Sequence, residues 1–163
     1  MSSTPSSDEW RGWLDGQAAR LLLYARQQTR CATDAEDVLQ EALVEAWEKC
    51  GGGAPPLALV FATIRRRAID LGRSADRRTA REESVEPEPW FAPEVEARDT
   101  ARVLEEAVKK LTPIYREVLT LKIWGGLTFQ EIAETLGVPL NTAASRHRYA
   151  LAELRGLLGE VRP

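Results

Sequence analysis

The chain has 163 residues, a formal net charge of −3, and a composition that is 44% hydrophobic and 29% charged. These values are typical of a soluble globular protein with one domain or two small ones, and they exclude nucleic-acid binding through overall positive charge. The first ten residues lack the apolar core of a signal peptide, and no apolar run is long enough to cross a bilayer. We therefore expect a cytoplasmic protein without membrane insertion.

Cysteine and histidine are scarce, which bears on metal binding and catalysis. Cys31 and Cys50 are the only cysteines, and His147 is the only histidine. Their spacing fits no zinc motif, so we expect reduced, inert thiols, no metal and no cofactor. The sequence also lacks a glycine-rich phosphate loop and a Ser/His/Asp arrangement, so we do not expect an enzyme. We expect His147 to be a surface residue or to lie beside a phosphate.

Three helices are predicted in the first half of the chain, because apolar residues recur there at helical spacing. Three glycines and two prolines between residues 51 and 56 separate the second helix from the third. The predicted helices cover about 10–29, 33–49 and 57–74.

Charge is distributed unevenly over the second and third of these helices. Six acids and no base lie between Asp34 and Glu48, whereas seven arginines and only two acids lie between Arg65 and Arg81. Two interpretations remain open: the runs form two different partner surfaces, or they are solvated helix faces.

Residues 75–94 lack apolar periodicity and contain three prolines within seven residues. This pattern predicts an extended linker between a domain at 8–74 and a domain at 95–160. Trp90 and Phe91 stand out in it. They either pin the linker to one domain or dock on a partner.

Four more helices are predicted in the second half. Two cover about 95–111 and 112–124, and the last two form a helix-turn-helix over 127–154. Strand-like alternation is absent from the sequence. The predicted fold class is therefore all-α, with two small helical domains joined by a flexible linker.

The helix-turn-helix carries the clearest local signals. Thr128 and Glu131 have the spacing of a capping box, and Gly137 supplies the residue that can adopt positive φ after a helix. The following helix opens with polar residues and continues into cations, as a helix that enters a major groove requires. Many helical hairpins with a glycine turn bind nothing, but the agreement of these signals favours DNA binding.

The chain as a whole resembles a bacterial RNA polymerase sigma factor of the extracytoplasmic-function type, in the sigma-70 family. Three segments carry the resemblance: DAEDVLQEALVEAW at 34–47, ATIRRRAIDLGR at 62–73, and the stretch from LTPIYREVL to ELRGLL at 111–158. The resemblance implies a protein that binds core RNA polymerase and directs promoter-specific initiation through the −10 and −35 elements. The alternative is an autonomous helix-turn-helix transcription regulator with a separate N-terminal interaction domain.

The resemblance assigns contacts to individual residues. It also implies contact between the second domain and the β flap, and an anti-sigma factor as a partner of many family members. Contacts to the β′ coiled coil of core polymerase are expected from Asp37, Gln40 and Glu41. Contacts to the −10 element of promoter DNA are expected from Arg65, Arg66, Asp70 and Arg73. Contacts to the −35 element are expected from Gln130, Asn141, Thr142, Ser145, Arg146 and Arg148.

Spacing gives an independent argument for the first group and a second interpretation for Asp70. Carboxylates recur at helical spacing along the second helix and make an acidic stripe suited to arginines on a coiled coil, at positions 37, 41, 45 and 48. Asp70 can instead orient Arg66 or Arg73 through a helical ion pair.

Three positions depart from the family pattern. The family often has tryptophan near position 59 and asparagine at 66, where this chain has Leu59 and Arg66. The −35 helix usually carries a cation at 144, where this chain has Ala144. Because alanine contacts only a thymine methyl group, we expect a different −35 sequence or a dependence on DNA shape.

Overall fold

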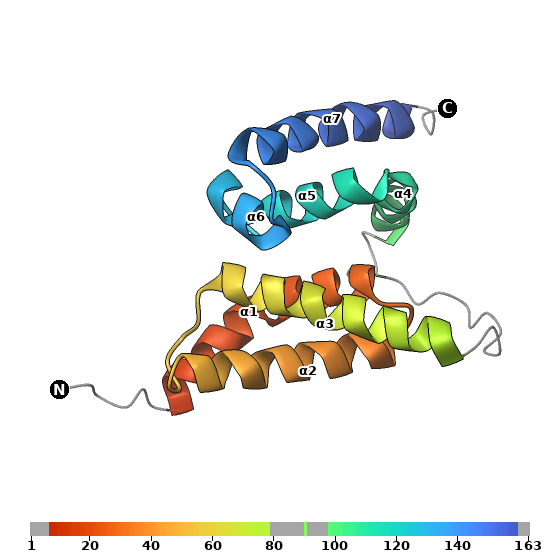
Figure 1. Ribbon diagram of the computed structural model, residues 1–163. Helices are drawn as coiled ribbons and strands as arrows, with labels where there is room; N and C mark the ends of the chain where they lie inside the picture. Colours follow the sequence, from red (N-terminus) through yellow and green to blue (C-terminus); the bar gives the residue numbers. More distant parts are fainter. Residues whose placement is uncertain (1–6, 79–89, 91–97, 160–163) are drawn as a thin grey trace. The chain divides into compact units, whose positions relative to one another are not determined.

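The computed structural model describes residues 7–78, 90 and 98–159, and within these ranges every regular element is an α-helix (Figure 1). The all-α prediction is confirmed. The chain divides into two compact units, which are described separately below. No helix in the described part of the chain is long and apolar enough to cross a membrane.

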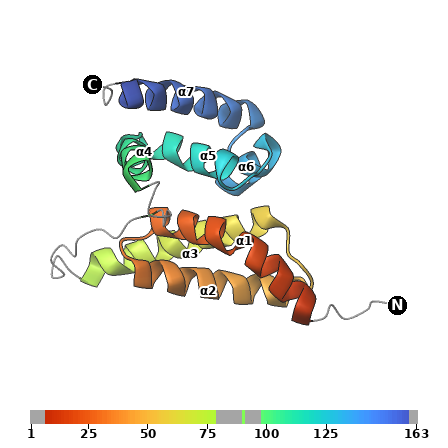
Figure 2. The same ribbon diagram turned by 180° about the vertical axis from the view of Figure 1, so that it is seen from behind.

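The first unit consists of α1 (Ser7–Gln28), α2 (Ala32–Lys49) and α3 (Leu57–Arg78), each packed on the other two (Figure 2). Its centre is an edge-to-face contact between Tyr24 of α1 and Phe61 of α3, with ring centroids 5.2 Å apart. Both rings are fully buried. Such a pair contributes about 0.5–1.5 kcal/mol beyond the burial of its apolar surface.

Two helix ends in this unit differ from the sequence expectation. Cys31 precedes α2 in an extended conformation, and its Sγ accepts the N–H of Asp34 at 3.5 Å, so the helix begins at Ala32. The third helix continues to Arg78, so the first residues of the predicted linker are helical. Apart from these and Trp90, the predicted linker lies outside the described residues.

Gly52 closes the turn after α2 beneath a tryptophan ring. Its φ is +87°, and a Cβ atom there would lie 3.2 Å from the ring of Trp47. Trp10 of α1 packs edge-on against the same ring, with centroids 4.8 Å apart. Glycine is therefore required at 52 both for its backbone conformation and for the close approach of Trp47.

The second unit consists of α4 (Arg98–Lys110), α5 (Pro113–Ile123), α6 (Phe129–Leu136) and α7 (Leu140–Gly159). The long helix α7 packs against the other three (Figure 1). The buried core of the unit joins α4, α5 and α7 through Ala107, Val108, Leu111, Leu119, Ala150 and Leu154.

Trp90 packs on the core of the second unit. Its backbone N–H donates to Glu105 Oε1 at 2.6 Å, and its ring lies under Lys109 Nζ at 5.1 Å and under the Arg116 guanidinium at 5.7 Å. The interpretation that Trp90 pins the chain to one domain is confirmed, and Phe91 lies outside the described residues.

Candidate nucleic-acid and polymerase interfaces

The helix-turn-helix has the local geometry that its sequence predicts. Thr128 Oγ1 accepts the N–H of Glu131 at 3.1 Å, while Glu131 Oε1 accepts the N–H of Thr128 at 3.0 Å, which completes the capping box. Gly137 adopts φ 68° and ψ 36°, and the carbonyl of Ala133 accepts N–H groups from Gly137 and Val138. The turn is thus fixed by hydrogen bonds within the motif.

Burial determines which side of α7 faces outward. Ala143 and Ala150 are fully buried and turn toward the core, and Ala133 of α6 is buried as well. Small side chains at these positions let α7 pack closely on the rest of the unit. The opposite side of the first two turns of α7 is therefore available to a partner.

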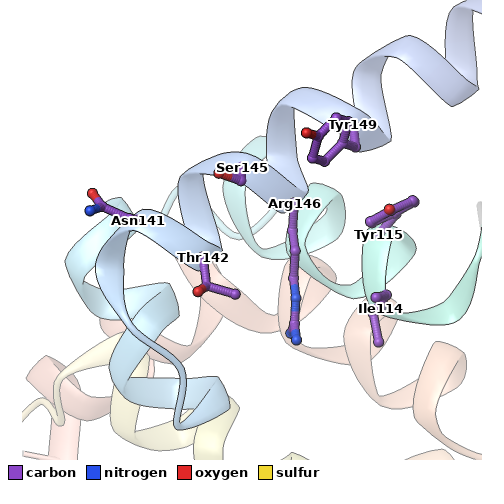
Figure 3. Close-up of a pocket in the computed structure, with 7 residues that line it drawn as sticks. All are labelled: Ile114, Tyr115, Asn141, Thr142, Ser145, Arg146 and Tyr149. Atoms are coloured by element: carbon purple, nitrogen blue, oxygen red, sulfur yellow. The ribbon is translucent and has the colours of Figure 1, made fainter.

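That outward side contains a hollow of about 350 Å³ between the first two turns of α7 and the start of α5 (Figure 3). Four of the six predicted −35 contacts line it, so the structure brings them together. The lining residues are Ile114, Tyr115, Asn141, Thr142, Ser145, Arg146 and Tyr149.

Ile114, Tyr115 and Tyr149 were not expected from the sequence. Tyr149 is 53% exposed and Ile114 is 45% exposed, so each presents apolar surface to solvent. The sequence signal for Tyr149 is its spacing, one helical turn after Ser145 on the same face. No comparable signal exists for Ile114, because its proximity depends on how α5 packs against α7.

The chemistry of the hollow suits the edges of bases. An asparagine amide can pair with adenine in two hydrogen bonds, an arginine with guanine, and a hydroxyl with either. In Figure 3 Arg146 extends from α7 beside Ile114, while Asn141 lies at the start of the helix. An apolar group beside polar donors matches a thymine methyl beside hydrogen-bonding base edges.

The other two predicted −35 contacts lie outside this hollow. Gln130 is exposed on α6, and its Nε2 donates to Glu134 Oε1 at 3.1 Å. Arg148 is exposed on α7, with its guanidinium 5.4 Å from the centre of the Tyr149 ring. Both positions suit contacts to the DNA backbone rather than to bases.

His147 contacts the preceding helix of the motif. It is half-buried, and its ring packs edge-on against Phe129 with centroids 5.3 Å apart. Burial, with the positive charge of Lys122 as a second cause, lowers the pKa of His147. The ring therefore packs α7 on the start of α6, and the position of His147 beside a DNA phosphate stays a prediction.

The predicted polymerase contacts share one exposed face of α2. Asp37, Gln40 and Glu41 follow one another at helical spacing, and all three side chains are exposed. Val44, one turn further, is 57% exposed and was not expected from the sequence. This face therefore combines two carboxylates and an amide with one exposed apolar side chain.

The acids of α2 and the arginines of α3 contact each other. Arg66 Nη2 lies 2.5 and 2.6 Å from the two carboxylate oxygens of Glu45. Arg67 donates to Glu45 at 3.1 Å and to Glu41 at 3.0 Å, and Lys49 Nζ lies 3.2 Å from Glu45. The two charge runs are therefore neither wholly separate partner surfaces nor wholly solvated faces.

Glu45 is the centre of this network. Hydrogen bonds from Arg66, and more weakly from Lys49 and Arg67, outweigh the opposing effect of burial and lower the pKa of Glu45 from 4.5 to about 2. Its side chain is 18% exposed, whereas that of Arg66 is 53% exposed. The carboxylate is thus charged at any physiological pH.

The remaining predicted −10 contacts lie on the same helix, α3. Asp70 and Arg73 are exposed, while Arg65 is half-buried. Asp70 was also expected as a possible ion-pair partner of Arg66 or Arg73; the guanidinium of Arg66 contacts Glu45, and the pair of Asp70 with Arg73 stays a prediction. The sequence placed the positions on one helix but missed the pairing partner on α2.

Among the described residues, no group of three or more His, Cys, Asp and Glu side chains is placed to hold a metal ion. The candidate surfaces combine amide, hydroxyl, guanidinium and carboxylate groups with exposed apolar side chains, which are Ile114 and Tyr149 in the hollow and Val44 on α2.

Two family models match the two units. The model for Sigma-70 region 2 matches residues 17–78, and the model for Sigma-70, region 4 matches residues 101–154. The ECF RNA polymerase sigma factor SigL of Mycobacterium tuberculosis is 35% identical over 158 residues, which covers 93% of this chain and 89% of the relative. SigK of Mycobacterium sp. (strain KMS), another ECF RNA polymerase sigma factor, is 29% identical over 135 residues, covering 77% of this chain and 70% of the relative.

Two solved structures have a similar fold. The sigma factor RpoE from Bartonella quintana, in complex with the anti-sigma factor NepR, has a TM-score of 0.69 at 21% identity, and the match covers 95% of this chain and 99% of RpoE. CnrH, in complex with the cytosolic domain of CnrY, has a TM-score of 0.63 at 24% identity, covering 96% of this chain and 93% of CnrH.

Proposed function

Because this chain belongs to the ECF RNA polymerase sigma factors, and is thus a sigma factor that directs promoter-specific transcription initiation, we propose how its surfaces divide that task. The exposed face of α2 binds core polymerase, α3 contacts the −10 element, and the start of α7 reads the −35 element. The assembly operates in the cytoplasm, where the transcribed DNA lies.

The observation that carries the −35 assignment is the hollow on α7. Asn141, Thr142, Ser145 and Arg146 converge there on the outward side of a recognition helix, behind a turn fixed by Gly137. Asn141 and Arg146 read bases, while Thr142 and Ser145 add shorter hydrogen bonds. Gln130 and Arg148 hold the phosphate backbone on either side.

The −10 assignment depends on exposed charge. Arg73 and the exposed part of Arg66 contact phosphates of the non-template strand, and Asp70 lies between them on the same helix. Arg65 supports this surface from a half-buried position. Because RNA polymerase separates the strands here, single-strand contacts of this type are required.

The polymerase assignment depends on complementary charge. Asp37, Gln40 and Glu41 present two carboxylates and an amide to basic side chains of the β′ coiled coil. The second unit makes a further contact with the β flap. Two weak DNA-reading units mounted on one polymerase act together, so effective concentration supplies the affinity that a net charge of −3 does not.

Run-off transcription with purified core polymerase on a promoter library tests this function directly. We expect transcripts from a subset of promoters that share −10 and −35 sequences, and poor binding of the free protein to the same duplexes by fluorescence anisotropy. Tight, specific duplex binding by the free protein would contradict the two-point mechanism.

We also propose a protein antagonist. RpoE and CnrH share this fold; RpoE was solved in complex with the anti-sigma factor NepR, and CnrH in complex with the cytosolic domain of CnrY. A partner of this kind would cover the polymerase-binding face of α2, including Val44. It would then block run-off transcription in proportion to its displacement of core polymerase, and inhibition without such displacement would contradict this site.

A further inference from the structure

The ion pairs between α2 and α3 join the two surfaces of the first unit. Glu45 contacts both Arg66 and Arg67, and Arg67 reaches across to Glu41 as well. Glu41 belongs to the proposed polymerase-binding face, whereas Arg66 belongs to the proposed −10 surface. The same charges therefore serve two surfaces that are assigned to different partners.

We propose that, in the free protein, the carboxylates of Glu45 and Glu41 bind the guanidinium groups of Arg66 and Arg67 where DNA phosphates would otherwise bind. These ion pairs restrain DNA binding until polymerase engages α2. The inference rests on the proposed function of α2 and α3. It adds Arg67 to the DNA-contacting residues and makes Glu45 the residue that controls their availability.

The geometry permits this exchange. Carboxylates and phosphates both bind a guanidinium through paired oxygens, so one group can replace the other. The Arg66 side chain is 53% exposed and that of Arg67 is 34% exposed, so a phosphate can reach either without unfolding the helix. Ion pairs at such exposure are weak and exchange readily.

Polymerase binding would favour a DNA phosphate over a carboxylate as the partner of Arg67. The Glu41 side chain is 58% exposed and lies on the same face as Asp37 and Gln40, so a basic side chain of a partner can contact it. That contact competes with Arg67 Nη1 for the Glu41 carboxylate and leaves this nitrogen available for a phosphate, while Arg67 Nε stays bonded to Glu45. Because coupling between binding sites is reciprocal, bound DNA would strengthen polymerase binding by the same factor.

The test uses the full chain without polymerase and a fluorescein-labelled single-stranded oligonucleotide, with binding measured by fluorescence anisotropy at several salt concentrations. Glu45→Gln is compared with Glu36→Gln, which removes the same charge from an exposed position on the same helix. We expect Glu45→Gln to bind about fivefold tighter than Glu36→Gln and to have a log–log salt slope steeper by about 1.4, from two further phosphate contacts. Equal affinity in the two variants would overturn the proposal.

A triple variant identifies the groups responsible. Glu45→Gln combined with Arg66→Gln and Arg67→Gln should lose the gain, whereas a gain that persists would implicate Lys49 and overturn the proposal. If Glu45→Gln does not fold by circular dichroism, Glu41→Gln decides the matter, because it breaks only the exposed pair with Arg67. It should bind about twofold tighter than Glu36→Gln, and equal binding would overturn the proposal.

Failure of this proposal and failure of the proposed function are distinguishable. The oligonucleotide assay contains no polymerase, so it tests only the restraint within the first unit. Pull-down of core polymerase by the unmodified chain tests the proposed function, independently of the state of Arg66 and Arg67.

Discussion

Glu153 of α7 accepts hydrogen bonds from both the backbone N–H of Thr112, at 2.8 Å, and its hydroxyl, at 3.2 and 3.1 Å. Thr112 immediately precedes α5 and makes no side-chain cap of its own. A side chain from α7 therefore holds the residue just before α5, beside the hollow that Ile114 and Tyr115 help to line.

The first prediction concerns this contact. Glu153→Ala should lower the free energy of unfolding of the second unit by about 1–2 kcal/mol, because it leaves the Thr112 N–H without its charged acceptor. Urea unfolding measures the loss. Glu153→Gln, which keeps an acceptor oxygen, should lose less than half as much, and equal losses in both variants would contradict the prediction.

Trp90 is predicted to stabilise the second unit. Trp90→Ala should lower its free energy of unfolding by about 1–3 kcal/mol, since the ring packs on the core and lies under two cations. Trp90→Phe keeps an apolar ring and should retain about half of the stabilisation. Thermal unfolding followed by circular dichroism measures the change, and a Trp90→Ala variant with an unchanged midpoint would show that the ring only rests on the surface.

Arg146 is predicted to read the promoter without contributing to polymerase binding. Arg146→Ala should reduce run-off transcription about 5- to 150-fold, which corresponds to the loss of about 1–3 kcal/mol for one arginine–base contact. Arg155→Ala is the matched control, because Arg155 is exposed further along the same helix. Loss of core polymerase in a pull-down with Arg146→Ala would show the assignment to be wrong.

Asp37 is predicted to contact core polymerase. Asp37→Arg should weaken co-elution with core polymerase at least about tenfold, because it places a cation against the basic partner surface. Glu36→Arg makes the same charge reversal at the adjacent exposed position, on a different side of α2, and should have a much smaller effect. Equal effects would indicate a response to overall charge rather than a contact at Asp37.

The contribution of Glu45 to stability is predicted to depend on pH. Its pKa falls from 4.5 to about 2 on folding, so the unfolded chain binds the proton more tightly than the folded one. The stabilisation is therefore fully present above about pH 5 and is lost as the pH falls from 4.5 toward 2. The unmodified chain should be more stable than Glu45→Gln by roughly 1 kcal/mol at neutral pH.

Urea unfolding of the two proteins at fixed ionic strength, between pH 7 and pH 2.5, measures this difference. The difference in the free energy of unfolding between the two proteins should become smaller below about pH 4.5. A gap that stays constant over this range would show that the charge of Glu45 is not the source of its contribution.

The sequence was a good guide wherever structure depends on residues a few positions apart. The capping box of Thr128 and Glu131 and the positive φ of Gly137 follow from short-range hydrogen bonds and backbone sterics, so they were predictable. The same reasoning placed four −35 candidates on one helix face. It misplaced the start of α2, where a cysteine sulfur accepts the capping hydrogen bond instead of an oxygen.

Contacts between helices could not be predicted from the spacing of residues along the sequence. The sequence indicated an acidic run and a basic run but not that Glu45 and Arg66, 21 positions apart, would meet. It gave no packing partner for His147, whereas packing of α7 on α6 sets that ring against Phe129. These outcomes depend on the rotation of each helix about its axis, which only the packed core decides.

The sequence alone therefore determined the helices, the turn between α6 and α7, and the polar face of α7, because each is encoded by interactions within one or two helical turns. Tertiary structure alone decided that Ile114 lies beside Arg146, that Glu153 holds Thr112, and that the arginines of α3 meet the acids of α2. Packing brings together residues that are distant along the chain, and helical periodicity gives the face of each residue but not its partner.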